Sequence, residues 1–221
     1  MNTNQKPYVV AITGASGAIY GIRAVQVLAS LGKNIALTIS NSARTVIQEE
    51  LAVDIGDLKK PNLDLLFPSP QSSPLRGEEK GEGDVLSRIS YYYHGDFTSP
   101  IASGSYPTEG MFVVPCSTTT LGRIAAGISQ TLVERAAECT IKEGRKLVIV
   151  PRETPLSAIH LENMLKLARL GVSVAPAMPG FYSGPKAMDD IVDFVVGKAL
   201  DQLQVPHGLF PRWTGSSYKS D

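Results

Sequence analysis

Short runs of consecutive apolar residues recur along the chain, and each is followed by a stretch whose apolar residues recur three or four positions apart. A continuous apolar run is typical of a strand buried on both faces of a parallel sheet, and the wider spacing is typical of a helix. The predicted strands are residues 8–13, 35–40, 111–114, 147–150 and 172–174. The predicted helices are residues 18–31, 41–51, a stretch after 116, then 132–142, 157–170 and 189–203. This alternation predicts one three-layer α/β/α domain over residues 1–221, with a flavodoxin-like or Rossmann-like parallel sheet.

The alternation breaks between residues 61 and 84. Residues 68–84 combine Pro, Ser, Gly and charged residues with almost no apolar side chains, so they have little to bury. Because the β/α pattern resumes afterwards, we interpret this stretch as a flexible surface insertion and not as a linker between domains. The tail from about residue 206 is rich in Gly and Pro and carries the only tryptophan, Trp213.

Composition narrows the class of protein. The 221 residues are 43% apolar and 19% charged. The 21 Lys plus Arg balance the 21 Asp plus Glu, so the formal net charge is zero and does not indicate nucleic acid or an anionic membrane as a partner. No apolar run approaches the roughly 20 residues that span a bilayer, and the polar start predicts no signal peptide, so we expect a cytoplasmic protein. Two cysteines without CxxC spacing and three scattered histidines predict no metal site.

The first predicted strand ends in a glycine-rich loop that contains Gly14, Ala15 and Ser16. Such a loop is either a plain turn or a cradle in which helix amides bind a phosphate. Gly14, Gly17 and Gly21 give G-x-x-G-x-x-x-G, which departs from the dinucleotide fingerprint G-x-G-x-x-G. The second strand ends in Ser40 and lacks the acidic ribose ligand of that fingerprint. The loop therefore favours FMN or another monophosphate over a dinucleotide.

Two further strands end in residues suited to anions. The strand at 111–114 is followed by four consecutive hydroxyl residues, Ser117, Thr118, Thr119 and Thr120, which is more than a helix N-cap requires. The strand at 147–150 is followed by Arg152 and Glu153. These two side chains form either a surface ion pair or a phosphate ligand beside a group that handles a proton.

Taken together, these segments resemble the UbiX-type flavin prenyltransferases. The resemblance covers nearly the whole chain apart from residues 61–88 and rests on motifs at 13–18, 102–105, 115–121, 132–137, 150–155, 160–165, 179–182, 192–196 and 211–213. It implies a homododecamer with active sites at subunit interfaces. It also implies that reduced FMN is alkylated by dimethylallyl phosphate at N5 and then at C6, without a metal. The implied products are phosphate and prenylated FMN, the cofactor of a UbiD-type decarboxylase.

The resemblance also implies roles for individual residues. The implied flavin-binding residues are Gly14, Ala15, Ser16, Ser40, Ser117, Thr118, Thr119, Thr120 and Arg152. The implied binding residues for dimethylallyl phosphate are Lys142, Arg152, Tyr182, Lys198 and Trp213. The implied catalytic residues are Ser16, Glu50, Lys142 and Glu153, and Glu49 is the alternative to Glu50.

Two of these assignments carry a qualification. Lys198 stands where the family has an arginine, which keeps the charge but loses the bidentate fork. Trp213 is either an aromatic face for the cationic prenyl fragment or a packing anchor of the tail.

Two other functions fit the flavin loops. One is an FMN-dependent decarboxylase of the cysteine decarboxylase group, and the other is a passive flavin carrier that does no chemistry. A further match, Tyr182-x-x-x-Lys186, fits the catalytic pair of short-chain dehydrogenases. Because Gly184 and Pro185 disfavour the helix that this pair needs, we interpret the match as chance. Cys116 is interpreted as a packed thiol beneath the second loop and not as a reactive one.

Overall fold

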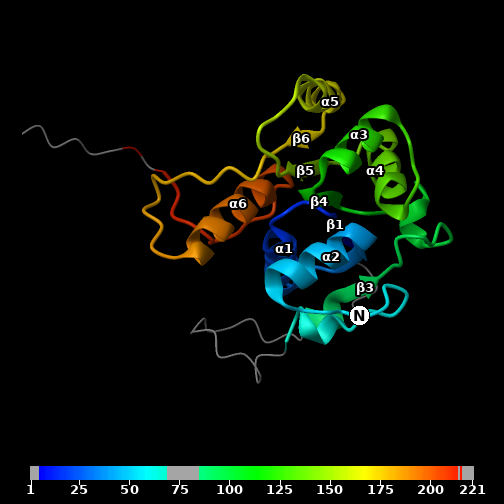
Figure 1. The fold of residues 1–221 in the computed structure, drawn as a ribbon, viewed down its shortest axis with the longest axis horizontal. Helices are drawn as coiled ribbons and strands as arrows, with labels where there is room; N and C mark the ends of the chain where they lie inside the picture. The colour runs from blue at the N-terminus through cyan, green and yellow to red at the C-terminus, as the bar shows by residue number, and fades with distance from the viewer. Residues whose placement is uncertain (1–4, 69–84, 214, 216–221) are drawn as a thin grey trace, which may run out of the picture.

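The computed structural model describes residues 5–68, 85–213 and 215, and within them it contains one six-stranded sheet. The strands are β1 (Tyr8–Ile12), β2 (Ile35–Ile39), β3 (Ile89–Tyr91), β4 (Gly110–Cys116), β5 (Leu147–Pro151) and β6 (Ser173–Val174). The α-helices are α1 (Ala18–Ser30), α2 (Asn41–Leu51), α3 (Thr118–Ala126), α4 (Leu132–Lys142), α5 (Ala158–Arg169) and α6 (Met188–Gln202). All neighbouring strands are parallel, in the order β3-β2-β1-β4-β5-β6 (Figure 1).

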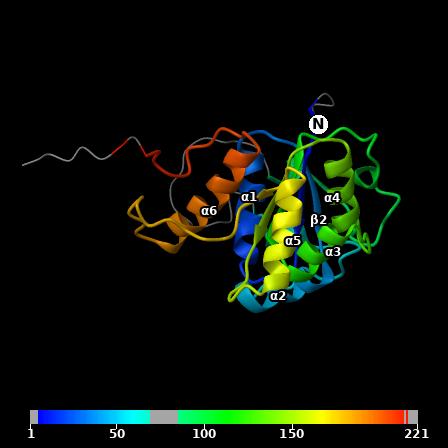
Figure 2. The same cartoon turned by 90° about the horizontal axis from the view of Figure 1, so that it is seen from above.

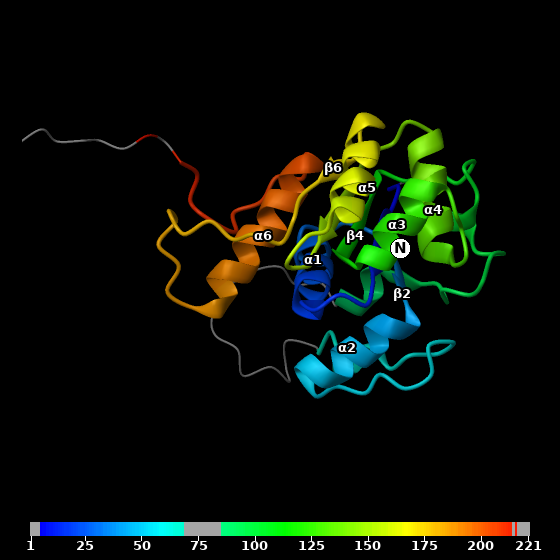
Figure 3. The same cartoon turned by 45° about the horizontal axis from the view of Figure 1, so that its top comes forward.

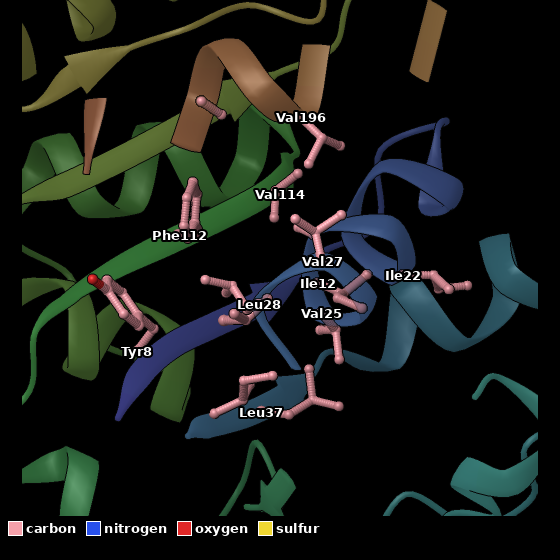
Figure 4. Close-up of a cluster of buried hydrophobic side chains, with 14 of the residues drawn as sticks. Tyr8, Ile12, Ile22, Val25, Val27, Leu28, Leu37, Phe112, Val114 and Val196 are labelled. Atoms are coloured by element: carbon pink, nitrogen blue, oxygen red, sulfur yellow. The ribbon is translucent and has the colours of Figure 1, made fainter. Parts of the chain in front are cut away.

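The side chains of the central strands alternate between two hydrophobic clusters. Tyr8, Val10 and Ile12 of β1 belong to the first cluster, with residues of α1, α2 and α6. Val9 and Ala11 of the same strand belong to the second, with residues of α3, α4 and α5. Figure 2 shows α1 and α6 on one side of the molecule and α3, α4 and α5 on the other, and Figure 4 shows part of the first cluster. The predicted three-layer α/β/α arrangement is confirmed.

The predicted strands and helices match the observed ones closely, with two differences. Sequence analysis missed β3, because this edge strand has only three residues and no continuous apolar run. It also ended the predicted strand at 111–114 too early: β4 continues through Pro115 to Cys116. A proline inside a central strand is unusual, because it has no amide to donate. The register shift between Val113 and Cys116 places Pro115 at an irregularity of the ladder, which accommodates it.

The predicted insertion falls almost entirely on residues 69–84, outside the described part of the chain. Short 3-10 helices lie on both sides of it, at Leu63–Leu65 and Val85–Arg88, and a third lies at Pro100–Ala102. Among the described residues, no helix combines the length and apolar character needed to cross a membrane.

The carboxyl ends of β1, β2, β4 and β5 meet at one edge of the sheet because these strands are parallel. The loops after them, at residues 13–17, 40, 117 and 152–157, contain most of the predicted site residues. The segment 175–187 then leads out from β6 to α6, and in Figures 1 and 3 this segment and residues 203–213 after α6 project from the body of the molecule.

Candidate functional site

Thr13 joins the loops that follow β1 and β4. Its hydroxyl donates to the Pro115 carbonyl oxygen at 2.7 Å and accepts from the Ser117 amide at 2.8 Å. The side chain is 1% exposed, so both bonds are shielded from water. The Ser40 amide likewise donates to the Ile12 carbonyl at 3.0 Å, which ties the loop after β2 to β1. The loops after β1, β2 and β4 are therefore fixed to one another by these contacts.

Two glycines allow the close approach of chain segments in the first loop. A Cβ added to Gly14 would lie 2.3 Å from both Cβ and Oγ of Ser42, so no larger residue fits beside the start of α2. Gly17, the N-cap of α1, has φ +98°, a left-handed conformation that L side chains rarely adopt. Ser40 caps α2 by accepting from the Ala43 amide at 3.1 Å.

The carboxylate of Glu50 lies on the N-terminus of α1. Its two oxygens accept from the Gly17 amide at 3.0 and 2.9 Å, and one also accepts from the Ala18 amide at 3.0 Å. Burial opposes ionisation, but hydrogen bonds from the Ser16 side chain and from these two amides, together with the charge of Arg152, hold the pKa of Glu50 below its usual value. The group is thus a carboxylate at neutral pH, placed where the helix dipole favours negative charge.

The neighbouring Glu49 is also exposed but makes none of these contacts. Of the two adjacent glutamates, Glu50 is the one that contacts Ser16. This geometry matches the pair that sequence analysis expected, while the catalytic role of that pair stays a prediction.

Arg152 and Tyr20 complete the group around the start of α1. Arg152 Nε donates to the Ser16 carbonyl at 3.2 Å. The Tyr20 ring covers Gly17, since a Cβ at Gly17 would lie 2.7 Å from two ring carbons. Burial raises the pKa of the Tyr20 phenol, and the charges of both Arg152 and Glu50 act on it. Sequence analysis missed Tyr20 because its position reads as an ordinary half-buried residue of an amphipathic helix.

The four hydroxyl residues after β4 divide into two pairs. Ser117 accepts from the Thr120 amide at 3.2 Å and donates to the Thr120 hydroxyl at 3.0 Å, so these two form the N-cap of α3. Thr118 is half-buried and Thr119 is exposed. The cap therefore uses only half of the run and leaves Thr118 and Thr119 as hydroxyls able to contact a ligand.

A cavity of about 440 Å³ lies beside the loop after β5. Arg152 and Glu153 line it with the apolar residues Met164, Pro176 and Met178. Glu153 is exposed and accepts from the Thr154 amide at 2.9 Å. Among the described contacts, Arg152 and Glu153 do not pair with each other, so the alternative of a surface ion pair is wrong. Both side chains therefore line a cavity whose wall combines a cation, a carboxylate and apolar side chains.

Three predicted residues lie on the projecting part of the molecule. The Tyr182 ring packs edge-on against Phe194 of α6 at 5.5 Å and against Trp213 at 6.0 Å between ring centroids. Lys198 lies on α6 with its ammonium 4.0 Å from Asp201. Trp213 is 65% exposed, yet it packs on Tyr182. These residues form a second group, and none of them lines the cavity beside Arg152.

Lys142 is not brought to the group around Arg152 within one chain. It ends α4, and the Met111 amide donates to the Lys146 carbonyl, so residues 142–146 lie at the amino ends of β4 and β5. Arg152 follows the opposite end of β5, and five strand residues span roughly 16 Å. Lys142 pairs with Glu143 at 2.6 Å and lies beside Gly104 of the 102–105 motif.

Sequence analysis also passed over Arg135, which lies on the same helix as Lys142. Its Nε donates to the Ala102 carbonyl at 2.9 Å, and its charge acts on the Lys142 ammonium. The signal was present, because Arg135 is part of the motif at 132–137. Arg135, Lys142 and the 102–105 motif therefore form one cluster along α4, which Lys142 ends at the edge of the sheet opposite the flavin loops.

The remaining candidates from the sequence are structural. Cys116 is buried, and burial raises the pKa of its thiol to about 12, so it is a packed cysteine as predicted. Tyr182 and Lys186 lie outside any helix, which removes the dehydrogenase-like pair. His160 is the third residue of a capping box with Ser157. In the part of the chain that the structure describes, no cluster of His, Cys, Asp or Glu side chains suits a metal ion.

The residues at the carboxyl edge fit a flavin monophosphate. Backbone amides at helix starts and the hydroxyls of Thr118 and Thr119 are phosphate donors, and Gly14 keeps the backbone free of a side chain. Arg152 and Glu153 beside an apolar cavity suit a second, phosphorylated apolar molecule.

Comparison with known proteins agrees with this interpretation. The Flavoprotein family model matches residues 1–200. A flavin prenyltransferase UbiX of Halalkalibacterium halodurans is 52% identical over 206 residues, 93% of this chain and 92% of that protein. The solved structure of AnUbiX (PadA1) in complex with FMN and dimethylallyl pyrophosphate has a TM-score of 0.78 and 34% identity, covering 96% of this chain and all of that one. A dodecameric FMN-dependent UbiX-like decarboxylase from Escherichia coli O157:H7 has a TM-score of 0.75 and 39% identity, covering 95% and 100%.

The cysteine decarboxylase alternative is less well supported. The FMN-dependent cysteine decarboxylase TvaF has a TM-score of 0.55 at 14% identity, a likeness that shows a common fold alone. The UbiX relatives share both fold and sequence with this protein over almost its whole length. The chain therefore belongs to the UbiX flavin prenyltransferase family.

Proposed function

We propose that this protein joins the dimethylallyl group of dimethylallyl phosphate to N5 and C6 of reduced FMN. The allylic C–O bond breaks, phosphate leaves, and N5 bonds to C1 of the prenyl group as the N5 proton is lost. The prenyl double bond then takes up a proton at C2, and the flavin C6 bonds to C3 of the prenyl group and loses its own proton. The product, prenylated FMN, is then available to a UbiD-type decarboxylase. The observation that carries the proposal is the cavity beside Arg152 and Glu153, directly next to the Ser16–Glu50 contact at the start of α1.

Arg152 stabilises negative charge in this reaction. Breaking the allylic C–O bond leaves additional charge on phosphate and cationic character on the prenyl fragment. Arg152 is held by the Ser16 carbonyl at the mouth of the first loop, so it is preorganised for the charge that develops. Lys198 and the Tyr182 hydroxyl lie outside this cavity in the same chain, so in this proposal they reach the phosphate from a neighbouring subunit, where the Trp213 face also stabilises the cationic fragment.

Two carboxylates have different tasks in the proposal. Glu153 is exposed on the cavity wall and transfers a proton to or from the phosphate. Glu50 stays ionised because of its amide donors and orients Ser16 toward the flavin. Glu153 is exposed at the cavity, whereas Glu50 is held by backbone amides, so we assign proton transfer to Glu153 and positioning to Glu50.

Lys142 acts in this proposal on a site in a neighbouring subunit of a homododecamer. It lies at the opposite edge of the sheet from Glu153, so one chain cannot supply both. The dodecameric relative from Escherichia coli supports a dodecameric assembly, and in this proposal that assembly brings the two edges of different chains together. Each active site then combines the flavin loops of one chain with Lys142 of another.

The transferase activity is tested by anaerobic incubation with reduced FMN and dimethylallyl phosphate, followed by mass spectrometry of the released flavin. We expect a flavin heavier by one five-carbon unit, absent with Glu153→Gln. Running the pyrophosphate in parallel identifies the preferred donor. Unchanged FMN that stays bound would favour the passive carrier, and decarboxylation of a peptidyl cysteine would favour the alternative enzyme.

The shared site is tested by mixing two variants. Lys142→Ala and Glu153→Gln are each expected to be inactive. If each site takes Glu153 from one chain and Lys142 from another, random 1:1 assembly restores about a quarter of the wild-type activity, since half of the chains carry each intact residue. Mixed dodecamers without activity would contradict the assignment of Lys142 to a neighbour.

A further inference from the structure

Asp201 on α6 is the centre of a polar cluster with Arg212, His207 and Lys198, and no predicted role is assigned to Asp201 itself. Its two carboxylate oxygens accept from Arg212 at 2.7 and 2.8 Å, in a bidentate pair, and one of them lies 3.2 Å from His207 Nε2. The Arg212 hydrogen bonds outweigh partial burial and lower the pKa of Asp201. Asp201 therefore ties both ends of the segment 206–213, which we call the strap, to α6.

The His207 side chain fixes the start of the strap. It is 1% exposed, and its Nε2 lies 2.9 Å from the Gly197 carbonyl oxygen, while its Nδ1 accepts from the Leu209 amide at 3.3 Å. Since Nδ1 accepts, Nε2 carries the proton and donates to α6. Gly197 permits this contact, because a Cβ there would lie 2.6 Å from the His207 ring.

Aromatic rings connect the strap to Tyr182. Phe210 packs on Phe194 at 5.0 Å between ring centroids, and Arg212 stacks over the Phe210 ring at 4.9 Å. Phe194 contacts one edge of Tyr182, and Trp213 contacts another. Tyr182 itself is 58% exposed, on a segment without regular secondary structure, so these rings set its position.

We infer that Asp201 is a positioning residue: by holding Arg212 it keeps Trp213 against Tyr182 and so fixes the Tyr182 hydroxyl for the phosphate of the allylic substrate. This inference rests on the proposed function for the role of Tyr182. Asp201 itself is remote from the flavin loops, so it acts on the binding of the phosphorylated substrate and not on that of FMN.

The inference is tested with Asp201→Asn, which keeps the shape but loses the charge that holds Arg212. We expect the KM for dimethylallyl phosphate to rise about tenfold, with kcat and FMN affinity changed less than twofold. Trp213 is the only tryptophan, so its fluorescence reports the strap directly. We expect quenching by acrylamide to increase. Asp189→Asn, on the exposed first turn of the same helix, is the matched control and should match the wild type in all four readouts.

An unchanged KM or unchanged Trp213 quenching in Asp201→Asn overturns the inference. If that variant does not fold, Arg212→Lys keeps the charge while losing the fork, and it is expected to give the same changes at about half their size. Wild-type protein that fails to prenylate FMN would refute the proposed function alone. In that case Trp213 fluorescence still tests the contact between the strap and Tyr182. A change in Tyr182→Phe and Asp201→Asn supports this contact, and no change contradicts it.

Discussion

Both carboxylate oxygens of Glu50 accept the amide of Gly17, across 33 positions of sequence. This contact joins the end of α2 to the start of α1 and places a negative charge on the flavin loop. Glu49, one position earlier, offers an internal control with the same side chain and no such contact.

Glu50→Gln is expected to destabilise the protein by about 1–2 kcal/mol, because an amide accepts the two backbone donors less strongly than a carboxylate. For a chain of this size that lowers Tm by roughly 2–8 °C. Prenyl transfer is expected to fall by at least tenfold, through the loss of the Ser16 contact. Glu49→Gln should leave both Tm and rate close to wild type. Equal effects of the two substitutions would contradict the assignment of Glu50.

The contribution of Glu50 to stability is expected to depend on pH. The pKa of Glu50 is lower in the folded protein than the value of about 4.3 in an unfolded chain. Its stabilisation is therefore fully present above pH 4.3 and is lost as pH falls through the folded pKa. The difference in Tm between wild type and Glu50→Gln should be constant from pH 8 to 6 and shrink below pH 4.3. If the difference in Tm instead grew as the pH fell, the pKa of Glu50 would not be lowered in the folded protein.

Gly14→Ala is expected to destabilise the protein by about 1–3 kcal/mol and to abolish FMN retention, because the new methyl would overlap Ser42. Ser42→Gly removes the overlapping atoms, so the double variant should recover a large part of the stability. Gly208→Ala, at a position with open space, is the control. Thermal unfolding and flavin absorbance of the purified variants measure both effects. Stable, flavin-loaded Gly14→Ala would show that the loop can shift.

Lys198→Arg is expected to lower the KM for dimethylallyl phosphate by about three- to tenfold, because a guanidinium restores the bidentate fork for phosphate. Lys198 is half-exposed and only 4.0 Å from Asp201, whose oxygens already bind Arg212, so the side chain is available to a ligand. Steady-state kinetics with varied dimethylallyl phosphate measure the change. A KM above that of wild type would mean that the new arginine competes with Arg212 for Asp201.

Both cysteines are expected to be inert in the folded protein. Cys116 and Cys139 are buried, and the pKa of the Cys116 thiol is raised to about 12, so thiolate is scarce at neutral pH. A thiol reagent at pH 8 should label neither in the native state and both in denaturant. Labelling of the native protein that matches the loss of prenyl transfer would instead indicate a reactive Cys116.

The sequence was sufficient to predict the elements that are buried on both faces. β1, β2, β4 and β5 appear as continuous apolar runs because helices cover both sides of them. The three-residue β3 could not be found in this way, because an edge strand has no such run. Local motifs likewise located the loops of the site but not the side chains that reach it from elsewhere.

Tyr20 illustrates that limit. Its helical position predicts only a half-buried aromatic residue, and its closeness to Arg152 depends on how α1 meets the loop after β5. The distance of Lys142 from Glu153 is a second case, since a motif states which residue is used but not which copy of the chain provides it. Asp201 is a third, because its partner Arg212 lies in a tail whose course only the folded structure gives.

Thr13 has a consequence for the thermodynamics of ligand binding. Because its buried hydroxyl bonds to Pro115 and Ser117, the loops after β1 and β4 are ordered before any ligand arrives. These backbones therefore lose little conformational entropy when a ligand binds. The entropy lost on binding comes mainly from ordering exposed side chains such as Thr119 and Glu153.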